Sequence, residues 1–234
     1  MENIIEVRNL TYRYPDGKIA LDDLSFEIPE GETFGIIGPN GAGKSTLLLN
    51  IAGILTGTGS VKVCGIKTGR ETLKEVRKKV GFVFQDPNDQ LFMPTVFDDV
   101  SFSLIQLGYS REETGKLVQE SLSKVGLSGY ESREPHHLSF GEKKKITIAS
   151  VLVHEPELLI FDEPTANLDP ASRREFIEIV TNLSHTKIIA GHDMDLISRL
   201  CRKVIVINYG RKVAEDIPDR IFKDRELLLS NRLI

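Results

Sequence analysis

Gly38-Pro39-Asn40-Gly41-Ala42-Gly43-Lys44-Ser45-Thr46 is the stretch of this sequence that decides the fold. It matches the pattern G-x-x-x-x-G-K-[ST] in full. The apolar run Thr33 to Ile37 before it predicts a buried strand, and Thr46 to Ala52 after it predicts the start of a buried helix. Strand, glycine loop and helix in this order predict a phosphate cradle, because inward backbone N–H groups and the helix N-terminus attract anions. We expect Lys44 to reach the β- and γ-phosphates of a nucleotide and Ser45 to hold Mg²⁺.

The bulk composition is that of a soluble globular protein. The chain has 234 residues, 40% hydrophobic and 27% charged, with a formal net charge of −4. This balance disfavours a general nucleic-acid binder, which is usually basic. Cys64 and Cys201 lie far apart without a CxxC motif, which indicates a reducing cytosol and ordinary core packing. We expect no secretory signal and no membrane span, so a membrane-spanning part would come from another chain.

The order of expected elements changes along the chain. Residues 4–7 and 19–28 read as antiparallel strands that 60–63 joins, whereas from Thr33 onward strands alternate with helices. Residues 95–154 look almost wholly helical, with Val96, Val100 and Leu104 on one face. We therefore predict a single α/β domain over 1–234 with four parts. These are an antiparallel β part (1–30 and about 58–67), a core with a parallel sheet (31–94 and 155–215), a helical subdomain (95–154) and a short tail (216–234).

Two further motifs carry chemistry. Leu158 to Glu163 is an apolar strand ending in two acids, which predicts Asp162 as an organiser of Mg²⁺. Glu163 follows at once and is expected to orient and polarise a water for attack on the γ-phosphate. Ser139 precedes a long helix, and Glu142 stands three residues later as in a capping box. That helix N-terminus is also expected to present donors to an anion.

With these motifs the chain resembles the ATP-binding-cassette (ABC) ATPases over nearly its whole length. GPNGAGKST looks like their Walker A loop, LLIFDE like Walker B and LSFGE like the signature motif, usually LSGGQ. Gln85 resembles the Q-loop glutamine, Asn167-Leu168-Asp169 the D-loop, His192 the switch histidine and Tyr14 the aromatic that stacks on adenine. Phe140 and Glu142 depart from the usual signature, which puts close approach of a phosphate at Phe140 in doubt.

The resemblance implies a P-loop NTPase fold of the ABC type, with a RecA-like parallel-sheet core, a small antiparallel β subdomain and an inserted helical subdomain. It implies ATP and Mg²⁺ as ligands, catalytic roles for Glu163, His192, Gln85 and Lys44, and Ser45, Gln85 and Asp162 at the metal. It also implies a head-to-tail dimer in which each ATP is gripped by one subunit's Walker motifs and the other's signature. The implied nucleotide contacts are Tyr14, Gly38, Pro39, Asn40, Gly41, Ala42, Gly43, Lys44, Ser45, Thr46, Ser139, Gly141 and Asp169.

The run from Phe84 to Val96 looks most like the energy-coupling-factor (ECF) importers of the cobalt/nickel type, together with Tyr14-Pro15-Asp16-Gly17, Pro135-His136-His137-Leu138 and Lys143-Lys144-Lys145. That resemblance implies peripheral attachment to the cytoplasmic face of the cell membrane. The partners would be a second ATPase subunit, a transmembrane coupling protein and a substrate-binding membrane component, without nucleic acid. Asp98 and Asp99 would receive an arginine of the coupling protein, or are simply favourable acids in a first helical turn.

Other functions remain as alternatives. They are an ECF vitamin importer, a soluble ABC ATPase of DNA repair or translation, and a simple P-loop kinase or GTPase. The kinase or GTPase class leaves LSFGE, Gln85 and His192 unexplained. Isolation together with membrane proteins, rather than with ribosomes or DNA, would favour the importer.

Overall fold

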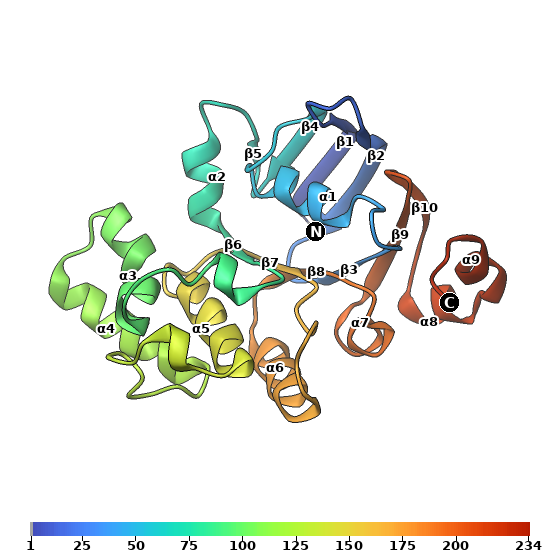
Figure 1. Cartoon of the computed structure of the whole chain (residues 1–234). Helices are drawn as coiled ribbons and strands as arrows, with labels where there is room; N and C mark the ends of the chain where they lie inside the picture. Colours follow the sequence, from blue (N-terminus) through green and yellow to red (C-terminus); the bar gives the residue numbers. More distant parts are fainter. Residues whose placement is uncertain (1) are drawn as a thin grey trace. The chain divides into compact units, whose positions relative to one another are not determined.

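The computed structural model describes residues 2–234, and the chain divides into two compact units. The first unit contains the chain up to Val80 together with Glu157–Pro164 and His185–Ile234. The second contains Gly81–Pro156 and Thr165–Ser184. The expected helical segment 95–154 lies inside the second unit, which also takes in 81–94 and 165–184. Figure 1 labels the elements of both units along the chain.

The first unit holds a small antiparallel sheet in the order β2-β1-β4-β5. In β1, Val7 pairs with Phe26 of β2 on one side and with Val61 of β4 on the other, and all three side chains are buried. The expected antiparallel strands near the N-terminus are therefore confirmed. The strands are β1 (Asn3–Arg13), β2 (Ile19–Pro29), β4 (Thr58–Val63) and β5 (Ile66–Lys67).

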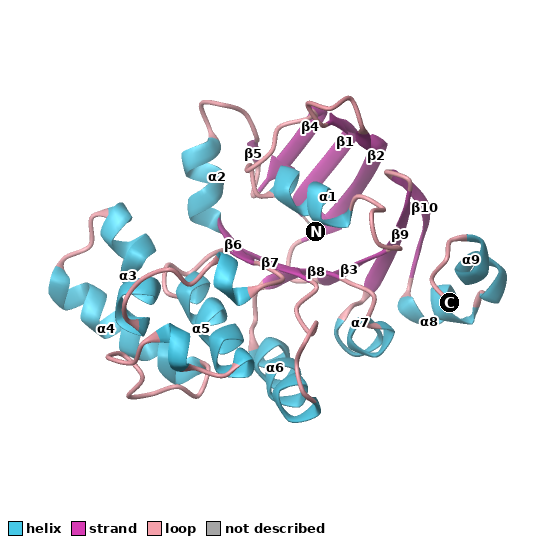
Figure 2. Cartoon of the chain, in the orientation of Figure 1, coloured by secondary structure: helices cyan, strands magenta, loops and turns pink. Residues whose placement is uncertain are grey.

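The first unit also holds the strands of a second, mostly parallel sheet, in the order β10-β9-β3-β8-β7 (Figure 2). They are β3 (Thr33–Ile37), β7 (Leu158–Asp162), β8 (Thr186–Ala190), β9 (Lys203–Asn208) and β10 (Arg211–Asp216). β3 runs parallel to β8 and β9, β7 runs parallel to β8, and β10 is antiparallel to β9. Because carboxyl ends of parallel strands meet at one edge, this order brings the segments after β3, β7 and β8 together.

Helix α1 (Lys44–Ile51) contacts strands of both sheets and buries Leu47, Leu48 and Ile51 against them. Each fully buried aliphatic side chain of this kind contributes about 1.5–3 kcal/mol. The other helices of the first unit are α2 (Leu73–Lys79), α7 (Met194–Leu200), α8 (Pro218–Lys223) and α9 (Arg225–Ser230). The last two lie in the short tail 216–234. Among residues 2–234 no helix is both long and apolar enough to cross a membrane.

In the second unit, helices α3, α4 and α5 pack against one another. Val100, Leu104, Val118 and Leu122 are fully buried there, and for Val100 and Leu104 the apolar spacing predicts this burial. The expectation of an almost wholly helical block is wrong between α4 and α5, where turns and a short 3₁₀ helix that begins at Pro135 replace the α-helix. The elements are β6 (Val80–Val83, at the border with the first unit), η1 (Pro87–Asp89), α3 (Val96–Leu107), α4 (Arg111–Lys124), η2 (Pro135–His137), α5 (Phe140–Leu152) and α6 (Pro170–Asn182).

Candidate active site

The glycine loop leaves β3 and ends at Gly43, directly before α1. Gly43 has φ 107°, and a Cβ on it would lie 2.5 Å from the carbonyl oxygen of Ala20 in β2, so only glycine fits. On the other side the backbone N–H of Gly210 donates to the carbonyl of Ala42 at 3.0 Å. The loop is thus held between β2 and the turn that joins β9 to β10. These backbone contacts within the protein hold the glycine loop in place.

The ammonium of Lys44 lies inside this loop. Its Nζ donates to the carbonyls of Gly38 at 2.9 Å and Pro39 at 3.4 Å, and it lies 3.3 Å from Oε1 of Glu163. Only 6% of the side chain is exposed. A buried ammonium is costly unless such partners surround it. Its position at the loop suits it to meet the negative charge of a nucleotide phosphate.

Asp162 and Glu163 stand where β7 ends, and both are buried. Asp162 is in register with Ala190 at the end of β8, and the backbone N–H of Glu163 donates to the Ala190 carbonyl at 2.8 Å. Glu163 has φ 44°, a left-handed conformation that is unusual for this residue type and is typical of functional sites. The strand therefore delivers two acids at the edge where the glycine loop begins.

His192 follows β8 and contacts Glu163 twice. Its Nδ1 lies 2.8 Å from Oε2, and its backbone N–H donates to the same oxygen at 3.4 Å. The preceding Gly191 was given no role by the sequence, although a Cβ there would lie 3.1 Å from Oε2. A glycine at this position gives the carboxylate room, and no local sequence signal marks that need. Gly191 is therefore a site residue that sequence reasoning missed.

Tyr14 lies just after β1, half-buried. Its hydroxyl and Oγ1 of Thr46 form a hydrogen bond of 2.9 Å, and its ring meets Tyr12 edge to face with centroids 5.0 Å apart. These contacts fix the phenol beside the first turn of α1. An aromatic face held there suits the base of a nucleotide whose phosphates occupy the loop. Ser45 is exposed in the same first turn.

The remaining predicted residues belong to the second unit. Gln85 is exposed after β6, Ser139 is the exposed N-cap of α5, and buried Gly141 lies in its first turn. Asp169 caps α6 by accepting from the backbone N–H groups of Ala171 and Ser172. The hydroxyl of Ser172, which donates to the same carboxylate, is the main cause that lowers the pKa of Asp169.

Ser139 forms the expected capping box with Glu142. The Ser139 hydroxyl and backbone N–H donate to Oε2 of Glu142 at 2.7 and 2.9 Å, and the Glu142 N–H donates back at 3.3 Å. The hydroxyl of Tyr130 donates to the other carboxylate oxygen at 2.7 Å. These hydrogen bonds, led by that of the Ser139 hydroxyl, lower the pKa of Glu142. The helix start is thus rigid, with Ser139 at the surface.

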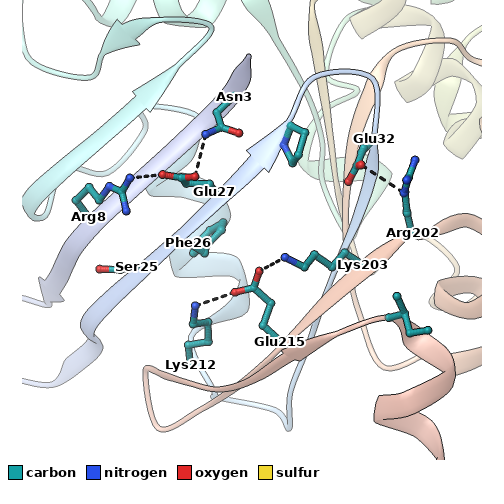
Figure 3. A pocket seen from close by; sticks show the side chains of 12 residues that line it. Asn3, Arg8, Ser25, Phe26, Glu27, Glu32, Arg202, Lys203, Lys212 and Glu215 are labelled. Carbon is teal, nitrogen blue, oxygen red and sulfur yellow. Dashed lines mark hydrogen bonds and ion pairs between the residues drawn. The ribbon is translucent and has the colours of Figure 1, made fainter. Parts of the chain in front are cut away.

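A cleft of about 580 Å³ in the first unit contains none of the predicted residues (Figure 3). It lies between β2 and the β9–β10 pair. Its positively charged side chains are joined to its negatively charged ones in ion pairs. We assign the site by its chemistry rather than by the size of this cleft. The charged groups that line it are Arg8, Glu27, Glu32, Arg202, Lys203, Lys212 and Glu215.

The donor set of the first unit fits a magnesium nucleotide. The Ser45 hydroxyl and the Asp162 carboxylate are hard oxygen ligands of the kind Mg²⁺ takes, and phosphates and water normally complete its shell. When bound, the ion neutralises charge that develops on the transferred phosphoryl group. The same unit places the ammonium of Lys44 and the carboxylate of Glu163 at the braced loop.

The sequence matches known proteins along nearly its whole length. The family model described as ABC transporter matches residues 21–166. The chain is 48% identical to a putative ABC transporter ATP-binding protein of Geobacter sulfurreducens, over 99% of its length and 93% of that protein. It is 47% identical to the energy-coupling factor transporter ATP-binding protein EcfA of Methanothermobacter thermautotrophicus, over 96% of its length and 74% of that protein.

Solved structures show the same fold. The structure of cbiO1 from Clostridium perfringens, described as part of the ABC transporter complex cbiONQ, has a TM-score of 0.86 and 38% identity, and the match covers 100% of this chain and 96% of that one. A dimeric ATP-binding cassette in a post-hydrolysis state, bound to ADP and Pi, has a TM-score of 0.82 and 29% identity, with coverage of 92% and 98%. The chain belongs to the ABC transporter family, as an ATPase that binds ATP with Mg²⁺.

Proposed function

We propose that this protein is the motor subunit of an ECF-type importer, and that the cargo is a transition-metal ion such as cobalt or nickel. The observation that carries the importer assignment is the match to cbiO1, which spans the whole of this chain. The name of the EcfA relative supports the same class. The choice of cobalt or nickel rests on the resemblance of the run from Phe84 to Val96, and of the shorter motifs given with it in the sequence analysis, to the cobalt/nickel type.

We assign the roles in hydrolysis as follows. Glu163 accepts a proton from the attacking water, and His192, whose Nδ1 lies 2.8 Å from that carboxylate, orients it. Lys44 stabilises negative charge on the phosphates. Ser45, Asp162 and Gln85 hold Mg²⁺, and Gln85 also responds to the γ-phosphate. The geometry of Lys44, Glu163 and His192 supports this division of roles.

We propose that two subunits pair head to tail when ATP binds. Ser139 and Gly141 of one subunit would then close on the nucleotide held by the other. The exposed position of Ser139 at a capped helix start supports this, because backbone N–H groups there attract anions. Binding of the γ-phosphate by both surfaces drives the pair together, and hydrolysis releases it.

An apolar surface on the second unit supports docking of a transmembrane coupling protein. Phe92 is 61% exposed and stacks edge to face on Phe102, which is 39% exposed, and Ile105 on the same helix is 57% exposed. Exposed large side chains in one group mark interaction sites. A membrane partner attached there would place this chain peripherally at the cytoplasmic face of the cell membrane.

Transport by the reassembled complex tests the proposal. The chain would be purified with its membrane partners, reconstituted in vesicles and supplied with ATP. We expect uptake of radioactive Co²⁺ or Ni²⁺, and no uptake with Glu163→Gln in place of the native chain. Uptake of a vitamin instead would establish the vitamin importer. Isolation with ribosomes or DNA and without membrane proteins would overturn the importer assignment.

A further inference from the structure

The segment after β6, from Phe84 to Gln90, is tied to helix α5 by side chains. The amide of Gln90 reaches α5 and donates to the Thr147 carbonyl at 3.1 Å and to Oγ of Ser150 at 2.9 Å. Its Oε1 turns back and accepts the backbone N–H of Phe84 at 3.3 Å. One side chain therefore joins the residue before Gln85 to the body of α5, and all these residues belong to the second unit.

Lys144 holds the same residue through its carbonyl group. Its Nζ donates to the carbonyl of Phe84 at 2.8 Å, and the residue is only 1% exposed. Phe84 thus has its N–H bound by Gln90 and its C=O bound by Lys144, directly before Gln85. We call these two side chains and the backbone of Phe84 the Phe84 clamp. A further lysine of α5, Lys143, donates to Oδ1 of Asn88 at 3.0 Å.

Stability alone is a poor explanation for a lysine at this place. Burying an ammonium is costly, and an apolar side chain of similar volume often serves a core equally well or better. What an apolar side chain does not supply is a strong, directed hydrogen bond to one carbonyl. The clamp therefore fixes a position rather than filling a space.

We propose that Lys144 and Gln90 are positioning residues for ATP hydrolysis, which act through Gln85. By clamping Phe84 to α5, they make Gln85 and the N-terminus of α5, with Ser139 and Gly141, parts of one rigid body. A shift of Gln85 is then a shift of the signature helix, because packed elements joined by directed bonds move together. This inference rests on the proposed role of Gln85 at the nucleotide.

A double-mutant cycle tests it on the full-length chain. Steady-state hydrolysis would be measured for Lys144→Met, for Gln85→Ala and for the two together. We expect Lys144→Met to lower kcat about five- to tenfold with KM for ATP within about twofold, and to lower it less than about 1.5-fold once Gln85 is Ala. Lys145→Met is the matched control, because Lys145 is paired with Glu175 of α6 instead, and we expect its kcat unchanged.

Gln90→Met serves as the second arm, and it decides the question if Lys144→Met does not fold. It keeps the volume and removes the three hydrogen bonds of the amide, so the same loss of kcat and the same non-additivity with Gln85→Ala are expected. Equal losses of kcat in the native chain and in Gln85→Ala would show that the clamp is only a structural feature. That result would overturn this inference and leave the proposed role of Gln85 standing. Full activity of Gln85→Ala would overturn both the inference and the proposed role of Gln85.

Discussion

Glu163 joins Lys44 to His192 through its two carboxylate oxygens. Oε1 lies 3.3 Å from the Lys44 ammonium, and Oε2 lies 2.8 Å from Nδ1 of His192. The side chains of Lys44 and Glu163 are 6% and 11% exposed, whereas that of His192 is 71% exposed. The carboxylate therefore has one oxygen at the buried ammonium of the glycine loop and the other at an exposed imidazole. In the proposed mechanism, this relationship makes Glu163 the centre of the first unit's chemistry.

Glu163→Gln tests that centre. Glutamine keeps the size of the side chain and an oxygen for Lys44, but it does not accept a proton from water. We expect ATP binding to persist, turnover to fall by a factor on the order of 10²–10⁴, and an ATP-bound dimer to accumulate. Phosphate release and size-exclusion chromatography with ATP measure these effects. Unchanged turnover would exclude Glu163 as the base.

Lys44→Ala removes the cation from the loop. We expect ATP binding to be lost, because the loop then keeps its N–H groups but has no ammonium for the phosphates. Calorimetric titration with Mg-ATP measures the affinity, and thermal unfolding reports the cost of leaving buried Glu163 without its ion pair. Lys223→Ala, in an exposed ion pair on α8, is the control and is expected to bind normally. Retained nanomolar-to-micromolar affinity in Lys44→Ala would contradict the phosphate role.

Two variants of Tyr14 separate its ring from its hydroxyl. Tyr14→Phe loses the hydrogen bond to Thr46 but keeps the ring, and we expect ATP affinity to fall about three- to tenfold, matching roughly 0.5–1.5 kcal/mol. Tyr14→Ala also loses the stacking surface, which is worth about 1–3 kcal/mol per base, so its affinity should be lower still. Fluorescent ATP displacement ranks the three proteins. Equal affinities in all three would remove Tyr14 from the base site.

The parts of this structure that could be predicted are those whose signals are local. The loop from Gly38 to Thr46, the strand before it and the capping box of Ser139 and Glu142 each lie within a few residues, and each is found as expected. The alternation of strands and helices also predicted the parallel sheet. That sheet brings the ends of β3, β7 and β8 to one edge, so Lys44, Glu163 and His192 converge although they are distant in sequence.

The parts that could not be predicted depend on contacts between distant segments. Gly191 owes its importance to the Glu163 carboxylate nearby, and nothing in its neighbours in sequence shows that. Tyr130 donates to Glu142 from a turn that the helical pattern did not predict. The Phe84 clamp likewise needs a lysine and a glutamine from separate elements. Periodicity reports which faces are buried, but not which polar groups meet inside.

Asp99 gives a prediction about stability and pH. Its Oδ1 accepts the N–H groups of Phe92 and Met93, each at 3.0 Å, while within residues 2–234 its buried Oδ2 has no hydrogen-bond partner. Burial raises the pKa of Asp99. A raised pKa favours the protonated form in the fold, so this stabilisation is full below the unfolded pKa of about 3.9 and is lost as pH rises through the folded pKa.

Asp99→Asn removes the charge and keeps an oxygen for both N–H groups. We expect Tm at pH 7 to rise by about 2–4 °C, equivalent to about 1 kcal/mol, with no gain near pH 4. Asp98→Asn is the control, because the Asp98 carboxylate accepts the Thr95 hydroxyl at 2.6 Å, and we expect no gain in Tm there.

The same variant addresses docking. Weaker binding of the coupling protein to Asp99→Asn would show that an arginine of that protein docks on Asp99. Unchanged binding would mean that Asp99 serves only as a favourable acid in the first turn of α3. A lower Tm at pH 7 would contradict the stability prediction.

Ser139→Arg tests the signature assignment, and the chain supplies a matched control. Ser139 caps α5 and Ser110 caps α4 through the same kind of capping box, so either substitution removes an N-cap worth about 1 kcal/mol. In Ser139→Arg we expect the monomer to bind ATP as before, because the Walker loop is untouched, but dimerisation to fail because the bulky cation stands at the closing surface.

Ser110→Arg is expected to lose similar stability and still to dimerise with ATP. Light scattering with ATP, in a background that carries Glu163→Gln, compares the two directly. If both variants fail to dimerise, the loss of the cap explains the defect and the signature assignment has no support. If both dimerise, Ser139 does not face the partner's nucleotide. Only failure of Ser139→Arg alone fits a phosphate site that two subunits complete, because in the proposed dimer only that serine begins the helix that closes on the partner's nucleotide.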